Sequence, residues 1–216
     1  MSEAAIAAPR AEATWDWVRN GAFAGIGAVI LWVVAFFIIG DVTNKDDATK
    51  ILAAYHDHDV RILAGGLIFV IGVGLFFFFL GALRSRLLAA EGGNGPVTTV
   101  AYAGGVAVAT ILAIFPSVDG AGAIDEKHLD PSAASAIHKL GDAFFVAAEY
   151  LLPVLLIGTA IVVLKTKVFP AWVAWLSIVI AVVLWIGPIG WAALIFAFPI
   201  WVLIVSTHLL RGARAV

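Results

Sequence analysis

Long stretches without a charged residue follow one another along the chain, and short polar segments separate them. Each is long enough to supply the roughly 20 apolar residues with which a helix crosses a hydrocarbon core about 30 Å thick. Three of them lie between Arg19 and Asp41, Arg61 and Arg84, and Glu91 and Asp119; a fourth, between Asp142 and Lys165, is interrupted only by Glu149, and the last extends from Val168 to Leu210. This pattern predicts an all-α, polytopic membrane protein.

The last uncharged stretch is too long for one crossing and suits two. The segment IGPIG at 186–190 divides it, because Pro and Gly end helices and form tight turns. Six spans are therefore predicted in a single domain covering residues 21–210, with residues 1–20 before it and a tail at 211–216. Pro116 is expected to end the third span, and Pro199 predicts a kink in the sixth. The predicted spans cover residues 21–40, 62–83, 97–116, 141–164, 170–187 and 190–209.

Two helix starts are predicted in the loops on the side opposite the termini. Asp130 followed by Pro131 has the pattern of an N-cap and a first helical residue, so the fourth helix is expected to begin near 131, ahead of its span. In the first such loop, Asn44 is expected to cap a short helix. Ile51, Leu52 and Tyr55 would share one face of that helix.

The distribution of Lys and Arg predicts the orientation in the membrane. An even number of spans places both termini on one side, and the positive-inside rule assigns that side to the cytoplasm. The basic residues on that side are Arg10, Arg19, Arg84, Arg86, Lys165, Lys167, Arg211 and Arg214. The opposite side carries most of the acids, which are Asp41, Asp46, Asp47, Asp57, Asp59, Asp119, Asp125, Glu126 and Asp130.

Composition supports lipid as the solvent and excludes several kinds of chemistry. The chain of 216 residues is 62% hydrophobic and only 13% charged, whereas a soluble domain is about half apolar and a quarter charged. A net charge of −2 gives no indication of nucleic-acid binding, and the absence of cysteine excludes disulfides and thiolate ligands. The expected partners are membrane lipids, with a homodimer or a larger complex possible because six short helices enclose little volume.

The candidate chemistry lies in HKLGDAFFVAAEYLLP at 138–153. On a helix, His138, Asp142 and Glu149 fall within an arc of about 40°, and His138 and Glu149 are separated by roughly 16 Å. Glu149, followed by Tyr150, is the only acid well inside a span, and a charge there costs at least about 3 kcal/mol. The pattern indicates a proton or cation path, or the floor of an outward-open cavity. The alternative is a protonated Glu149 bonded to a neighbouring helix.

A second candidate is a metal site on the side opposite the termini. The segment YHDHDVR at 55–61 supplies His56 and His58, which together with His138 and Asp142 would suit a divalent metal. However, H-x-H places both rings on one side of a strand and not of a helix, and no H-E-x-x-H motif is present. The alternative is a solvated acidic loop. No cofactor is predicted, and a divalent metal remains possible.

Three segments carry a resemblance to a known family. YHDHDVR before the second span, FLGALRSRL at its end and FPAWVAWLSIVIAVVLWIGP in the fifth span resemble a family of uncharacterised multi-span integral membrane proteins common in actinobacteria. The family has no assigned activity. The resemblance therefore implies the architecture and a bacterial plasma membrane, and it implies no catalytic residue.

These observations leave three functions open. The first is a module that binds or transports a small molecule, a cation or a proton through an outward-facing polar cavity on the fourth span, with Glu149 as the ionisable group. The second is a non-catalytic subunit or scaffold of a membrane complex. The third is a membrane metalloenzyme that uses the His and Asp residues of the outer face.

Overall fold

The protein is a bundle of helices, and its computed structural model describes residues 8–40 and 47–213, with only the backbone for residues 8–16, Pro188 and Ala213. The order is α1 (Ala8–Ile39), α2 (Ala48–Asp57), α3 (Asp59–Ala90), α4 (Pro96–Ile124), η2 (Glu126–His128), α5 (Pro131–Thr166), α6 (Ala171–Leu184), α7 (Gly187–Ala192), the π-helical η3 (Ala193–Ala197) and α8 (Phe198–Ala213). No strand occurs within these ranges.

Five helical stretches are long and apolar enough to cross a membrane. They are Trp17–Ile39, Asp59–Ala90, Pro96–Ile124, Pro131–Thr166 and Ile189–Gly212, and α6 is a shorter apolar helix. This confirms the predicted all-α class with several membrane-spanning helices.

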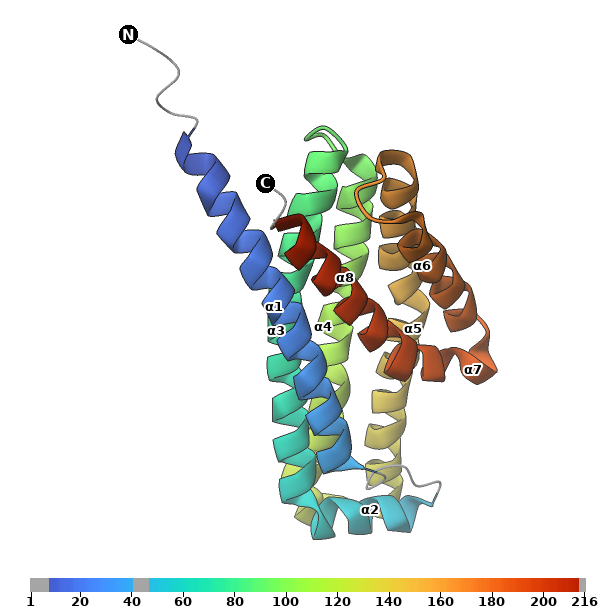
Figure 1. Ribbon diagram of the computed structural model, residues 1–216. Helices are drawn as coiled ribbons and strands as arrows, with labels where there is room; N and C mark the ends of the chain where they lie inside the picture. The colour runs from blue at the N-terminus through green and yellow to red at the C-terminus, as the bar shows by residue number, and fades with distance from the viewer. Residues whose placement is uncertain (1–7, 41–46, 214–216) are drawn as a thin grey trace.

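The long helices lie side by side, and α2 lies across one end of the bundle (Figure 1). The first described residues of α1 and the last of α8 lie at the opposite end, where the turn between α3 and α4 is also found (Figure 1). Helices α6, α7 and α8 cover only the part of the bundle away from α2 (Figure 1). The ends of α3, α4 and α5 next to α2 therefore extend beyond the level of α7.

The third predicted span continues beyond its expected end. Helix α4 passes through Pro116 and ends only at Ile124, so the prediction that Pro116 ends it is wrong. Proline is tolerated in membrane helices where neighbouring helices pack against the break, and Pro116 is buried against Gly66 of α3. Asp119 consequently lies in a helix and not in a loop.

The start of the fourth helix is confirmed, because α5 begins at Pro131 and the Asp130 side chain accepts a hydrogen bond from the Ala133 N–H at 2.8 Å. Asn44 lies outside the described residues, and the N-cap of α2 is Asp47, whose side chain accepts from the N–H groups of Thr49 and Lys50. Helix α6 ends at Leu184, before the predicted limit at 187. The irregularity expected at Pro199 takes the form of η3, a π-helical segment immediately before that proline.

The core is built around aromatic rings of α1, α3 and α8. Phe76 and Phe79 are fully buried, whereas Phe77 and Phe78 are exposed, so the FFFF segment presents two rings to the core and two to the surroundings. Trp201 is also fully buried, and its indole Nε1 donates a hydrogen bond to Ser177 Oγ of α6 at 2.8 Å. This bond links α8 to α6 within the apolar core.

We expect Ser177→Ala to lower the free energy of unfolding by about 1–3 kcal/mol, because it leaves the buried Trp201 indole without an acceptor. Thermal unfolding of the detergent-solubilised protein would measure the effect. Thr110→Ala is the matched control, since the exposed Thr110 hydroxyl bonds only to Val106 of its own helix. Equal stability of the two variants would contradict the role assigned to this bond.

Candidate functional site

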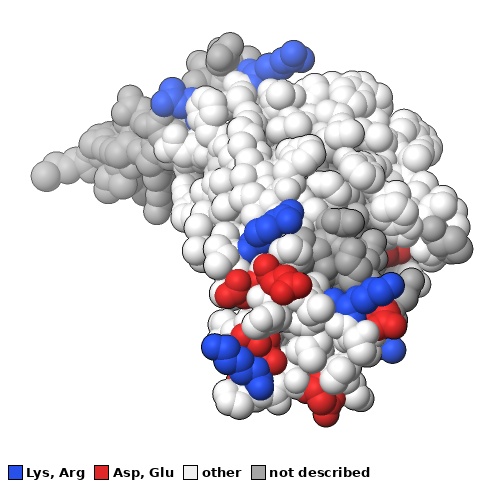
Figure 2. Space-filling model, turned by 90° about the horizontal axis from the view of Figure 1, so that it is seen from below, with Lys and Arg blue, Asp and Glu red and all other residues white. Residues whose placement is uncertain are grey.

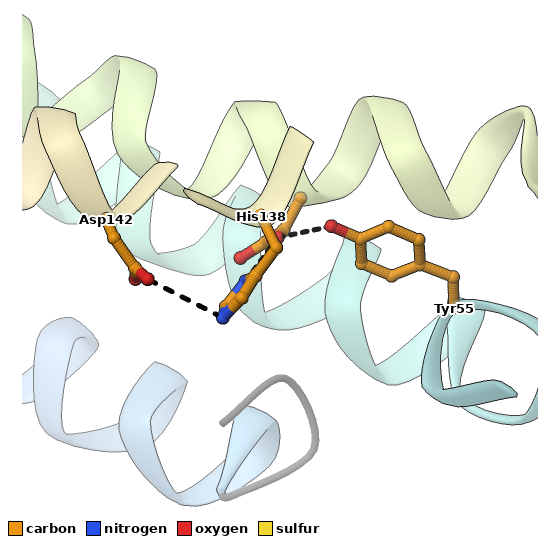
Figure 3. Close-up of polar contacts among 4 residues, drawn as sticks. Tyr55, His138 and Asp142 are labelled. Atoms are coloured by element: carbon orange, nitrogen blue, oxygen red, sulfur yellow. Dashed lines mark hydrogen bonds and ion pairs between the residues drawn. The ribbon is translucent and has the colours of Figure 1, made fainter. Parts of the chain in front are cut away.

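Four polar side chains from three helices meet at the end of the bundle that carries α2 (Figure 3). They are Tyr55 of α2, Asp119 of α4, and His138 and Asp142 of α5. Sequence analysis predicted two of the four, His138 and Asp142, as site residues. We call this group the α2-end cluster.

The α2-end cluster depends on how α2 sits across the bundle. Helix α2 buries Ile51, Ala54 and Tyr55, and the Tyr55 ring lies directly on Gly122 of α4, where an added Cβ would overlap the ring. Gly122 is one helical turn after Asp119, so the tyrosine hydroxyl reaches the carboxylate on the same face of α4.

Asp119 is the centre of the cluster. Its Oδ1 accepts a hydrogen bond from the Tyr55 hydroxyl at 2.6 Å, and His138 Nδ1 lies 3.1 Å from the same oxygen. The other imidazole nitrogen, Nε2, lies 3.8 Å from Asp142 Oδ2 (Figure 3). The imidazole thus stands between two carboxylates.

Surface exposure falls along the cluster. The Asp142 side chain is 61% exposed, that of His138 13% and that of Asp119 9%, and Tyr55 is fully buried. Burial raises the pKa of Tyr55 well above its usual range, and the hydrogen bond to Asp119 raises it further. The hydroxyl therefore remains protonated and acts as the donor to Asp119.

This arrangement has the groups needed to pass a proton from the surface inward. An imidazole can bind a proton on one ring nitrogen while it releases one from the other. The exposed Asp142 faces Nε2, and the buried Asp119 faces Nδ1. The cluster therefore has the order of groups of a short relay, from an exposed carboxylate through an imidazole to a buried carboxylate.

Glu149 lies elsewhere. It is 3% exposed and faces Gly190 of α7, and among the described residues no hydrogen bond or ion pair joins it to His138 or Asp142. Tyr150 is exposed, and its backbone carbonyl accepts a hydrogen bond from the Trp185 indole at 3.4 Å. The single polar seam that the sequence suggested is thus divided between two places on α5.

The structure does not bring the proposed metal ligands together. His56 pairs with Glu126 at 3.3 Å, and His58 lies at the corner between α2 and α3. Within the described parts of the chain, no group of three or more His, Asp and Glu residues is arranged to hold a metal ion. Of the four candidate ligands, His138 and Asp142 form one ion-pair contact, at 3.8 Å.

Sequence reasoning missed Tyr55 and Asp119 as site residues. The sequence pattern predicts only an apolar helix face for Tyr55, and a helix end at Pro116 predicts a loop position for Asp119. The small residues of DGAGA at 119–123 were a usable signal, since they allow another helix to approach closely. Tyr55, the hydrogen-bond partner of Asp119, lies 64 positions earlier in the sequence, so no local sequence pattern predicts this contact.

Comparisons with protein families, with curated proteins and with solved structures find no match to this chain. The fold and the site therefore define a class, an α-helical membrane protein with a buried Tyr–Asp–His cluster at one end of its bundle.

We expect the stability that Tyr55 confers to depend on pH at the alkaline end. A group whose pKa is raised by folding stabilises the protein below its unfolded pKa, about 10 for tyrosine, and this contribution falls above it by up to about 1.4 kcal/mol per pH unit. Melting temperatures of wild type and Tyr55→Phe between pH 8 and 11 would test this. The wild type should be the more stable at pH 8, and its advantage should shrink above pH 10. A gap that stays constant would contradict the assignment.

Proposed function

We propose that this chain is a six-span plasma-membrane protein that takes up protons at the face carrying α2 and uses them in proton-coupled binding or transport. The observation that supports it is the graded exposure of Asp142, His138 and Asp119 around one imidazole. A structural cluster needs no exposed member, whereas an uptake site does. The further transfer across the membrane, and any small molecule or cation that moves with the proton, belong to the proposal.

The charge distribution supports an outward-facing cluster with both termini in the cytoplasm. Acidic and basic side chains gather at the α2 end (Figure 2). At the other end, one acid, Glu91, is found among the described side chains. The basic residues among the described side chains of that end are Arg19, Arg84, Arg86, Lys165, Lys167 and Arg211. The positive-inside rule then makes that end cytoplasmic.

The short helix α6 indicates where the hydrocarbon ends. Its 14 residues extend over only about 21 Å, less than the about 30 Å of a hydrocarbon core. Exposed Trp185 and Trp191 flank the corner between α6 and α7, as expected at a membrane interface. We count α6 as the fifth of six spans because a bilayer can thin locally around a short helix and because these two tryptophans mark its outer end. The α2-end cluster then stands outside that corner, where water would reach Asp142.

Each member of the cluster has a role in proton uptake. Asp142 attracts the proton, His138 accepts it at Nε2 and releases one from Nδ1, and Asp119 receives it. The Tyr55 hydroxyl holds Asp119 Oδ1 in place, because this hydroxyl stays protonated and donates. No metal or cofactor is required for these steps.

Proton uptake into liposomes would test the proposal. The purified protein would be reconstituted with an internal pH-sensitive dye, and an imposed pH gradient should collapse faster than in protein-free liposomes. His138→Ala should slow the flux by about 100-fold, because it removes the group that transfers the proton. His128→Ala is the matched control, since His128 is an exposed histidine at the same end and, within the described part of the chain, pairs with Asp125 alone.

Two outcomes would overturn the proposal. One is wild-type flux no faster than in protein-free liposomes, and the other is equal flux in wild type and His138→Ala. Absence of flux together with co-purification of defined membrane partners would favour the alternative, a non-catalytic subunit or scaffold.

A further inference from the structure

The corner between α6 and α7 leaves a backbone acceptor free. Helix α6 ends at Leu184, and the residue four positions on, Pro188, has no N–H to donate to the Leu184 carbonyl. Among the described backbone hydrogen bonds of this corner, those from Trp185, Ile186 and Gly190 end on other carbonyls. Leu184 is fully buried, so water does not satisfy this oxygen.

The Glu149 carboxyl lies against the same corner. A Cβ added to Gly190 would overlap Glu149 Oε1 and would stand 2.6 Å from the Leu184 carbonyl oxygen. The carboxyl of α5 and the free carbonyl of α6 thus share the space that the missing side chain of Gly190 leaves open. Both groups are buried, and in the described part of the chain no hydrogen bond reaches the Glu149 side chain.

No counter-ion faces Glu149 from the helices packed around it. The chain from Val168 to Thr207, which forms α6, α7, η3 and most of α8, contains no titratable residue. The same holds for residues 62–83 of α3 and for residues 103–118 of α4, beside this level of α5. On α5 itself, the adjacent Tyr150 is exposed.

An ionised Glu149 would therefore be unfavourable in three ways. It would be a charge removed from water. It would face the C-terminal end of α6, which carries the negative end of the helix dipole. It would also lie beside a second acceptor, the Leu184 carbonyl, with no donor between them. A proton on the carboxyl removes all three costs, because the acid can then donate to the carbonyl.

From this geometry we infer that Glu149 and the Leu184 carbonyl form a proton-binding site that holds the α6–α7 corner against α5. With the proton bound, the carboxyl donates to the carbonyl and the corner is held. Loss of the proton leaves two acceptors face to face, and the corner separates from α5. The site is distinct from the α2-end cluster, and only its part in transport rests on the proposed function.

A hydrophobic carbodiimide tests the protonation state of the wild-type protein. Such reagents react with protonated carboxyls in apolar surroundings, where the acid adds across the carbodiimide to give a stable N-acylurea without a leaving group. Mass spectrometry of the treated protein should find the adduct on Glu149. Glu91 is the matched control, because it accepts hydrogen bonds from the Thr98 N–H and hydroxyl as a carboxylate and should remain unmodified.

Hydrogen exchange tests the link to the corner. Amides of residues 185–192 should exchange about tenfold faster in Glu149→Ala than in wild type, the equivalent of one lost hydrogen bond of about 1.4 kcal/mol. Glu149→Gln should match the wild type at the same pH, because its amide N–H still donates to the Leu184 carbonyl.

The inference fails if Glu149 is unmodified by the carbodiimide. It also fails if the corner of Glu149→Gln exchanges as fast as that of Glu149→Ala. Neither measurement depends on proton flux. If Glu149 is modified but the protein shows no flux, the proton-binding site stands and the proposed function is wrong. If the protein shows flux but Glu149 is unmodified, the proposed function stands and the proton-binding site is wrong.

Discussion

The structure depends on one constraint, which is that polar groups shielded from water must find their partners inside the protein. The long helices meet it by bonding their own backbone. A proline has no N–H to donate, so it leaves a backbone carbonyl without its usual partner. This occurs at Pro116 in α4, at Pro153 in α5 and at Pro188 in α7. The two polar sites lie close to these interruptions. Asp119 follows Pro116 within one turn, and Glu149 lies one turn before Pro153 and faces the corner that contains Pro188.

The two sites answer the constraint in different ways. In the α2-end cluster, Asp119 is bonded to a tyrosine hydroxyl and an imidazole, and Asp142 is exposed at the surface. Glu149 is only 3% exposed, the described helices around it bring no cationic residue to it, and the Leu184 carbonyl beside it is an acceptor. Under the roles proposed for them, the first arrangement exchanges protons with water, whereas the second holds a proton until the helices around it move. Helix α5 contributes His138 and Asp142 to the first site and Glu149 to the second.

A glycine makes each site possible. The Tyr55 ring occupies the space above Gly122, and the Glu149 carboxyl occupies the space above Gly190. In both cases a methyl group would overlap the polar residue. Elsewhere in the bundle, glycines such as Gly104 and Gly158 bring α4 and α5 together directly. Small residues thus set both the helix spacing and the places where buried polar groups fit.

The sequence alone determined the class of the protein and most of its helices. Long runs without charged residues indicate segments that lie in lipid, so they predicted the spans. Asp130 followed by Pro131 predicted the start of α5. Only the tertiary structure decided that α4 continues past Pro116, that Tyr55 and His138 converge on Asp119, and that Glu149 faces α7. The reason is physical. Composition and periodicity describe how one segment meets its surroundings, whereas the partner of a buried side chain depends on which helices pack together and at what height.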